Sequence, residues 1–420
     1  MMTQAFYTGI SGLKNFSTGI DIVTDNIANI NTVGFRGYNA EFASLFEKRI
    51  STDGAMNTDS NGVGDGVRLQ STSMIESNGA LLQSDRSTDL ALLGDGWFGV
   101  ESNGEPIYTR DGTFGFDANS DLVSGDGYYV LGTLGGNISA DNVLTTTLDE
   151  VRLGDVTAQE KLRFPKSLTY PAKATTEVQF IANVGTGLEP AVVSSGVIDS
   201  SGAQNQLKLT FTKSAVQNPP GSQWDVTATT KSADGLISYD SQTGSVSFDS
   251  SGALISSTLT SINNNGTSVA IDLGSDYTGV VSMDLPIVPG SSSANGTPSG
   301  DLLGYSINKN AEVIATFSNG LQSSVGKIAV FHFQNNQGLE RLTGSRFQET
   351  NNSGAATFFQ DANGQNITGA DVVNFRLEGS NYELASGLTE LIVLQRSYDA
   401  SSKLVTTADQ MMQKALQMDA

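Results

Sequence analysis

Few residues of this chain have the types and spacing that chemistry requires. The 420 residues include no cysteine and one histidine, His332. This composition excludes disulfides, cysteine nucleophiles, thiolate metal sites and metal sites built from several histidines. His332 stands in an apolar, strand-like run between Phe331 and Phe333, and the chain has no G-x-S-x-G motif. We therefore interpret His332 as a core or interface residue rather than a catalytic one.

Three segments resemble ligand-binding loops only in part. Residues 94–99 read G-x-G-x-x-G, but a turn rather than a helix follows them, which favours a β-hairpin. Residues 320–327 have one residue too many for a phosphate loop and lack Ser or Thr after the lysine. Residues 117–128 begin like a calcium loop but lack its glycine and its final glutamate. The sequence thus predicts no catalytic, cofactor or metal site, although it leaves open a carboxylate pair among its 44 acidic residues.

The net charge limits the choice of partners. The chain carries a formal charge of −21, so it repels phosphate backbones and anionic membranes, and we predict no nucleic-acid partner. No apolar run approaches the ~18 residues that a membrane span needs, so we predict no membrane insertion. The first residues carry no basic stretch ahead of an apolar one, so export without a cleaved signal peptide is expected.

Both ends of the chain show helical periodicity. Apolar residues recur there at intervals of three, four and seven, and Pro is absent from residues 1–40 and 384–420. Periodicity sustained over several heptads is typical of coiled-coil packing. The residues predicted to form these stripes, as helix contacts of a polymer core, are Phe6, Ile10, Leu13, Ile20, Val23, Ile27, Ile30, Leu388, Leu391, Leu394, Tyr398, Val405, Met412 and Leu416.

The charge is distributed unevenly. Residues 1–35 and residues 384–420 each carry a net charge of −1, so nearly all of the negative charge lies between them. Identical copies can stack only where like charges are kept apart, and the nearly neutral ends suit such stacking. Periodicity alone leaves open whether the helices bury their stripes against other copies or simply pair with each other beside their own globule.

The middle of the chain has strand periodicity broken by turn pairs such as Asp126-Gly127. We predict an α+β fold in which terminal α-helices form a coiled-coil inner domain and two mainly-β domains lie outside it, the outermost inserted in the other. A polar, glycine-rich stretch at 51–66 is expected to form a long loop or arm. The predicted domains are a terminal helical domain (1–35 with 384–420), a connecting segment (36–70 with 355–383), a β domain (71–173 with 300–354) and an inserted β domain (174–299).

Several segments resemble the flagellar rod and hook axial protein family. Residues 25–36 (DNIANINTVGFR) resemble its N-I-A-N-x-N-T-x-G-F-K/R segment, and residues 108–114 resemble its Y-T-R-x-G-x-F hairpin. Residues 378–381 resemble its E-x-S-N-V segment, although Tyr382 stands where the family usually has Val. The resemblance covers about 1–173 and 300–420. The motif residues carried over are Asn26, Asn29, Asn31, Thr32, Gly34 and Phe35.

This resemblance implies a structural subunit of the flagellar hook, not an enzyme and without a cofactor. Such a subunit polymerises into a flexible hollow tube that transmits torque from rod to filament. Its implied partners are other copies of itself in a helical homopolymer, the rod, hook cap and hook–filament junction proteins, and the type III export apparatus. The implied location is extracellular, in the hook and basal body of the bacterial flagellum.

Two alternatives stay open. The inserted block favours hook over rod, but the distal rod protein also has a segment inserted near 51–66, so a distal rod or other hook–basal-body axial subunit is the closest alternative. An unrelated secreted β-rich binding protein or glycosidase would instead be a compact monomer with no need of its terminal helices.

Overall fold

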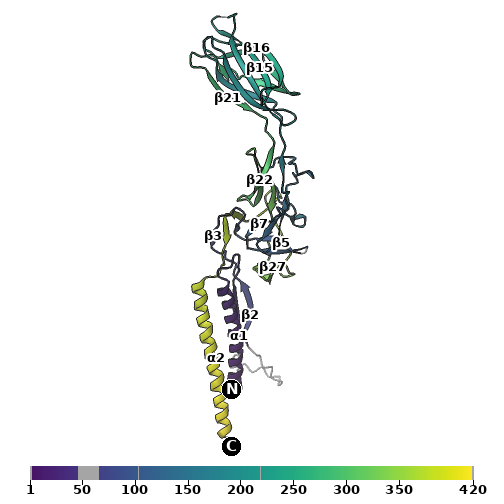
Figure 1. Cartoon of the computed structure of the whole chain (residues 1–420). Coiled ribbons are helices and arrows are strands. Elements are labelled where there is room, and N and C mark those ends of the chain that lie inside the picture. The colour runs from purple at the N-terminus through teal and green to yellow at the C-terminus, as the bar shows by residue number, and fades with distance from the viewer. Residues whose placement is uncertain (1, 46–65, 103, 218, 419–420) are drawn as a thin grey trace.

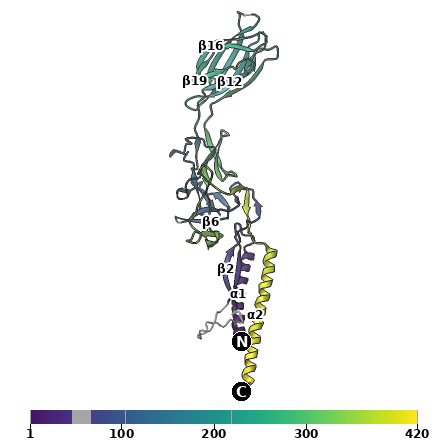
Figure 2. The same ribbon diagram turned by 180° about the vertical axis from the view of Figure 1, so that it is seen from behind.

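The computed structural model describes residues 2–45, 66–102, 104–217 and 219–418. The molecule is elongated, with two long helices at one end, a β body in the middle and a second β region at the far end (Figure 1, and from behind in Figure 2). The prediction of terminal helices on a mainly-β chain is confirmed. The stretch 51–66, predicted to be a loop or arm, lies outside the described residues except for Gly66.

Helices α1 (Met2–Ala28) and α2 (Leu384–Met418) lie side by side, and both chain termini lie toward their far end (Figures 1 and 2). The 35 residues of α2 correspond to roughly 50 Å of helix. Helix α1 ends before the turn that leads to Gly34, whose φ of +66° belongs to the left-handed region. The helices therefore form a rod that projects from the β body.

Strands β1 (Tyr38–Leu45) and β2 (Gly66–Met74) pair antiparallel and pack along α1. The side chain of Asn15 in α1 takes the place of a neighbouring strand. Its Nδ2 donates to the carbonyl of Val67 at 2.8 Å, and its Oδ1 accepts from the N–H of Leu69 at 2.7 Å. Backbone groups at the edge of β2 are thereby satisfied by the helix.

The β body is built around a sheet of thirteen strands. Its main path in spatial order is β11 (Thr169–Tyr170), β22 (Gly300–Ile307), β23 (Glu312–Phe317), β24 (Gln322–Ile328), β9 (Tyr129–Leu134), β5 (Trp97–Ser102), β6 (Glu105–Thr109), β27 (Arg346–Gln348) and β26 (Glu340–Leu342). The strands beside this path are β7 (Phe114–Phe116), β8 (Leu122–Ser124), β10 (Glu160–Lys161) and β25 (Val330–Phe331). Antiparallel neighbours dominate, which agrees with the many turn pairs of the sequence.

Shorter elements complete the body. The two-stranded pairs are β3 (Leu81–Gln83) with β31 (Arg376–Glu378), β4 (Leu90–Leu93) with β30 (Asp371–Asn374), and β28 (Phe359–Gln360) with β29 (Asn366–Ile367). Two short 3-10 helices, η1 (Val156–Ala158) and η2 (Asn336–Gly338), lie in connections. Aromatic side chains such as Phe98, Phe114 and Phe331 are buried in the core.

The far β region contains two five-stranded sheets. The first has the order β18 (Ser261–Asn264), β19 (Thr267–Asp272), β12 (Glu177–Asn183) and β20 (Val280–Val281), with β21 (Val288–Ala294) also paired to β12. The second has the order β13 (Ala191–Ile198), β14 (Gln204–Lys213), β15 (Ser222–Ser232), β16 (Ser238–Phe248) and β17 (Leu254–Ser257). Burial alternates along β12 and β14, so each sheet turns one face inward. Phe180, Phe211, Trp224 and Phe248 fill a core separate from that of the body.

The chain enters and leaves this far region along adjacent paths. The N–H of Lys173 donates to the carbonyl of Thr297 at 2.9 Å, and the N–H of Thr297 donates back at 3.0 Å. Asn295 adds a further hydrogen bond between the two segments, since its Oδ1 accepts from the N–H of Thr176 at 2.9 Å. The connection is thus a short antiparallel pair rather than two separate linkers.

Candidate functional site: the helix pair and its junction with the β body

The two terminal helices approach each other closely where small residues line the contact. A Cβ atom placed on Gly12 would lie 2.6 Å from the Oγ of Ser401, and one placed on Gly9 would lie 2.7 Å from a methyl carbon of Val405. Ser401 and Ala408 of α2 are buried. Close packing of this kind leaves no room for a larger side chain.

The predicted stripe residues are covered to different degrees within a single chain. Val23 and Leu394 are buried already in the single chain. The partly buried ones are Phe6, Leu13, Ile20, Ile27, Ile30, Leu391, Val405 and Met412. The exposed ones are Ile10, Leu388, Tyr398 and Leu416. Helix α1 thus covers only part of the apolar surface of α2.

The prediction missed a second row of apolar residues on α2. Val393, Leu404 and Met411 are 57 %, 51 % and 50 % exposed. At 100° per residue they fall on one side of the buried Leu394, Ser401 and Ala408, whereas Leu384, Leu388, Tyr398 and Leu416 fall on the other. Helix α2 therefore carries apolar residues on both flanks of the contact with α1. A search for flanking positions around the heptad stripe would have found the second row.

Leucine at Gly12 should loosen the helix pair. The added side chain overlaps Ser401 in the tight contact, and overpacking of this kind costs about 1–3 kcal/mol. We expect the helical circular-dichroism signal of Gly12→Leu to melt at a lower temperature than that of the native chain. Ala5→Leu introduces the same side chain at an exposed position of α1 and serves as the control. Equal melting of the two variants would show that the close contact does not stabilise the pair.

Residues of the motif at 26–35 tie the end of α1 to the β structure. Buried Asn26 donates from Nδ2 to the carbonyl of Tyr38 at 2.7 Å and accepts from the N–H of Tyr38 at 3.0 Å. Asn29 donates to Asp25 and accepts at 3.2 Å from the hydroxyl of Thr32, which closes the turn after the helix. Asn31 is exposed. The amides of Asn26 and Asn29 therefore bind local backbone and turn groups, whereas Asn31 faces away from these contacts.

Gly34 and Phe35 sit where the turn meets the β body. A Cβ on Gly34 would lie 2.4 Å from the backbone nitrogen of Asp111, so no larger residue fits. The N–H of Gly34 donates to the carbonyl of Glu378 at 2.7 Å. Phe35 is buried beneath the guanidinium of Arg341, which lies 5.0 Å from its ring centroid. Arg341 also reaches Asp25 of α1 at 2.9 Å, at the surface.

A buried ion cluster joins three segments that are far apart in the sequence. One carboxylate oxygen of Glu378 accepts a hydrogen bond from Arg110 at 3.1 Å, and the other forms an ion pair with Arg36 at 3.1 Å. All three side chains are at most 3 % exposed. The N–H of Gly79 donates to the same carboxylate at 2.9 Å, and Arg110 donates to the carbonyl of Gly94 at 2.7 Å. We call Arg36, Arg110 and Glu378 the junction cluster.

Burial affects the ionisation of the two arginines. It lowers the pKa of Arg36, and it lowers the pKa of Arg110 to about 10, while Glu378 acts in the opposite direction on both. Both guanidinium groups stay charged at neutral pH, so one carboxylate balances two buried cations. Asp95, 3.9 Å from Arg110 and half-exposed, supplies the second negative charge.

Asn381 and Tyr382 anchor the start of α2 to the same junction. Asn381 accepts from the N–H of Gly37 at 2.8 Å and donates to the carbonyl of Ile75 at 2.7 Å. Tyr382, at the position where the resemblance departs from the family pattern, is buried, and its ring lies so close to Gly387 that a Cβ there would be 2.5 Å away. The larger side chain is thus accommodated by a glycine one turn into the helix.

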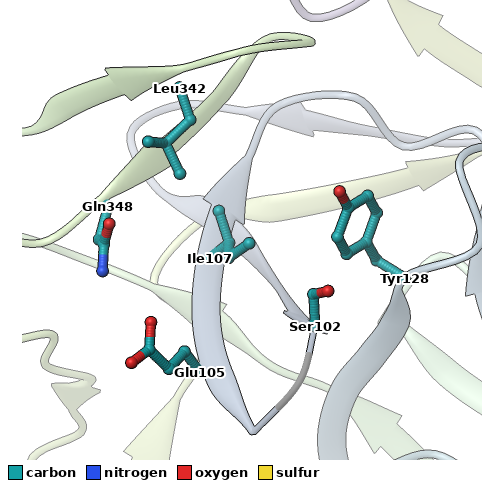
Figure 3. A pocket seen from close by; sticks show the side chains of 6 residues that line it. All are labelled: Ser102, Glu105, Ile107, Tyr128, Leu342 and Gln348. Carbon is teal, nitrogen blue, oxygen red and sulfur yellow. The ribbon is translucent and has the colours of Figure 1, made fainter.

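The rest of the described chain offers no comparable site for chemistry. A shallow hollow of about 350 Å³ lies beside β5, β6 and β26 (Figure 3), lined by Ser102, Glu105, Ile107, Tyr128, Leu342 and Gln348. Glu105 is its one acidic side chain. Among the residues described, no three His, Cys, Asp or Glu gather as metal ligands, and neither helix is both long and apolar enough for a bilayer crossing.

Four family models match separate parts of the chain. They are described as "Flagella basal body rod protein" (residues 6–36), "Flagellar hook protein FlgE/F/G D1 domain" (91–174), "Flagellar basal body protein FlaE D2 domain" (191–320) and "Flagellar basal body rod FlgEFG protein C-terminal" (374–418). The matches at 6–36 and 374–418 cover most of the two helices. Each residue of the junction cluster falls in a different match: Arg36 in 6–36, Arg110 in 91–174 and Glu378 in 374–418. The junction cluster therefore brings together residues from three separately matched parts of the chain.

Relatives match the chain nearly end to end. The flagellar hook protein FlgE of Borreliella burgdorferi is 28% identical over 463 residues, which cover 99% of this chain and 100% of that protein. The flagellar hook protein FlgE of Escherichia coli K12 is 26% identical over 432 residues, covering 97% and 98%. The crystal structure of Helicobacter pylori flagellar hook protein FlgE2 aligns at a TM-score of 0.49 with 15% identity, over 71% of this chain and 100% of that one.

The paired terminal helices, the β body and these four matches together define a class of protein, the axial subunits of the flagellum. The chain belongs to the flagellar rod and hook protein family, and within it to the hook proteins. This is a family of structural proteins and not of enzymes. The resemblance stated from the motifs is confirmed.

Proposed function

We propose that this chain is a structural subunit of the flagellar hook and polymerises into a flexible hollow tube that transmits torque from rod to filament. The observation that carries the proposal is helix α2, which keeps apolar rows exposed on both flanks of its contact with α1 in an otherwise acidic molecule. An apolar surface of this extent on a soluble chain marks a protein contact. Neighbouring copies supply that contact in the tube.

In this proposal the terminal helices form the inner layer of the tube as a coiled coil. The polymer-core contacts are the stripe residues predicted from the sequence together with Val393, Leu404 and Met411. The opposite side of α2, which carries Arg396, Lys403 and Gln410 among others, faces a hydrated channel. The nearly neutral ends allow copies to stack without close like charges.

We further propose a division of the chain into four parts. Residues 1–35 with 384–420 form the inner domain, and 36–70 with 355–383 form the connecting segment. Residues 71–173 with 300–354 form the first β domain, into which 174–299 is inserted as the outermost domain. The separate hydrophobic core of the far β region and its paired entry and exit strands support the last boundary.

The partners follow from this role. Other copies form the helical homopolymer, while the rod, hook cap and hook–filament junction proteins bound its ends. Delivery through the flagellar type III export apparatus, without a cleaved signal peptide, places the assembled protein outside the cell in the flagellum. The relatives named above as flagellar hook proteins support the location in the flagellum.

Electron microscopy of the purified full-length chain tests the proposal. We expect regular tubes of constant diameter under conditions of high protein concentration and salt, which screens the acidic outer surfaces. A chain that stays monomeric in all such conditions and loses nothing when residues 1–30 are removed would refute the role as a tube subunit.

Removal of the outermost domain should separate assembly from bending. Residues 174–296 can be replaced by a two-residue Asn-Gly turn, because Lys173 and Thr297 already face each other as an antiparallel pair. We expect the shortened chain to form tubes that are straight where native tubes curve, as seen by electron microscopy. Failure of the shortened, folded chain to assemble at all would show that the outermost domain is needed for the tube itself.

A further inference from the structure

His332 occupies a closed site between the body sheet and the strand pair β28–β29. Its side chain is 3 % exposed, and its ring lies 4.1 Å from that of Phe359, centroid to centroid. The backbone of His332 exchanges two hydrogen bonds of 2.9 Å with Thr357. Gly96 and Gly369 pack so closely that a Cβ on either would lie about 3 Å from a ring atom, at 3.0 Å and 2.9 Å respectively.

The hydrogen bonds of the ring fix its neutral tautomer. Nε2 lies 2.7 Å from the carbonyl oxygen of Thr368, which can only accept, so Nε2 carries the hydrogen. In the neutral ring Nδ1 then presents a lone pair. That atom is buried without a hydrogen-bond partner among the described residues and lies 4.0 Å from a carboxylate oxygen of Asp95. A lone pair facing a carboxylate is a position prepared for a proton.

Asp95 holds its negative charge over the range in which imidazoles titrate. Proximity to His332 is the largest influence that lowers the pKa of Asp95, to about 2, while desolvation opposes it and Asn336, the N–H of Gly96 and Arg110 add smaller effects. At 4.0 Å, Nδ1 of His332 and the Asp95 carboxylate are too far apart for a formed hydrogen bond, so the two groups face each other without one in this structure. Among the described residues no other carboxylate lies within 4.0 Å of the ring nitrogens.

The charged groups behind Asp95 belong to the junction cluster. Arg110 lies 3.9 Å from the Asp95 carboxylate, and Glu378 joins Arg110 to Arg36. The same carboxylate also accepts from Asn336 at 3.0 Å. Asp95 is therefore shared between the base of the helix pair on one side and His332 on the other.

We propose that His332 is a proton-operated latch between the β4–β5 turn and the β28–β29 strand pair. Uptake of a proton at Nδ1 turns the unpartnered lone pair into a donor, which binds the Asp95 carboxylate. Nε2 stays bound to Thr368, so the charged ring bridges the turn and the strand pair. This draws Asp95 toward His332 and away from Arg110, and it links acidity to the junction that carries the terminal helices.

The single histidine gives this latch a direct test. In the full-length chain labelled with ¹³C-histidine, one imidazole signal reports the protonation of His332 without assignment. We expect the titration midpoint to fall by roughly one pH unit in Asp95→Asn, because an opposite charge at this distance favours the charged form. Asp126→Asn removes an exposed carboxylate from the same body and should leave the midpoint unchanged. Equal midpoints in the native chain and Asp95→Asn would overturn the proposal.

Hydrogen exchange measures the mechanical part of the latch without a variant of the histidine. After correction for the intrinsic effect of pH, exchange in segments 91–96 and 357–369 should slow roughly two- to fivefold below the midpoint, which is the size expected for one partly shielded ion pair. Asp95→Asn should abolish the change. Exchange that is unaffected by pH in the native chain, despite a titrating ring, would show that the proton does not tighten this contact.

Discussion

Chains carrying Leu388→Glu or Leu404→Glu should remain monomeric under conditions in which the native chain forms tubes. The two leucines lie on opposite flanks of α2 and are 45 % and 51 % exposed in the single chain. A glutamate at either position is solvated in the monomer. In the tube it would be desolvated in an apolar contact, at a cost on the order of several kcal/mol. Sedimentation and electron microscopy at equal protein concentration measure the loss of assembly.

The matched control is Gln410→Glu, which adds the same charge on the side of α2 away from α1. It should assemble nearly as well as the native chain. Circular dichroism of all three monomers should show the same helix content, because the substituted positions are exposed in each. Tubes formed in native yield by both leucine variants would mean that the flanks of α2 do not contact neighbouring copies.

Glu378→Gln should destabilise the chain by about 3–5 kcal/mol, the loss typical of breaking a buried ion pair by removing one partner. The amide leaves the buried charges of Arg36 and Arg110 with only the half-exposed Asp95 to balance them, and it weakens the acceptor for the N–H of Gly79. Urea denaturation followed by tryptophan fluorescence measures the change, because Trp97 lies in the same β body, 5.6 Å from the Arg110 guanidinium.

Glu189→Gln makes the same chemical change at an exposed residue and should alter the free energy of unfolding by less than about 0.5 kcal/mol. A further variant separates the ion pair from the packing. Replacing all three residues of the junction cluster with Met or Leu removes the charges together and should recover much of the stability lost in Glu378→Gln. A Glu378→Gln chain as stable as the control would show that the cluster is screened by water.

The terminal helices could be predicted from the sequence because the pattern that specifies them lies within each segment. Periodic apolar residues without proline favour a helix wherever it packs, and α1 and α2 lie at the two ends of the chain that carry this pattern. Helix α1 ends at Ala28, so Ile30, the last residue of the predicted stripe in this segment, lies in the turn beyond the helix. The strands flanking Asp126-Gly127 were accessible for the same reason. The burial of His332 also followed from its neighbours, since Phe331 and Phe333 on either side are buried with it.

The junction cluster could not be predicted because its cause is not local. Arg110 and Glu378 are separated by 268 positions, and nothing in the spacing of either marks the other as its partner. Both residues lie in segments whose resemblance to the family was visible, but a motif position does not reveal a contact. The exposed row at Val393, Leu404 and Met411 was missed for a different reason, since a heptad stripe describes one seam and not its flanks.

The hydrogen-bonded pair at Lys173 and Thr297 has a practical consequence. These bonds hold the two strands that connect the β body to the far β region at a fixed spacing, whatever sequence lies between Lys173 and Thr297. A fluorescent or antigenic cargo whose own ends lie close together could be grafted there in place of the native sequence. In the tube proposed above, such a graft would lie on the outer surface at one site per copy, and its spacing along the tube would report the subunit repeat.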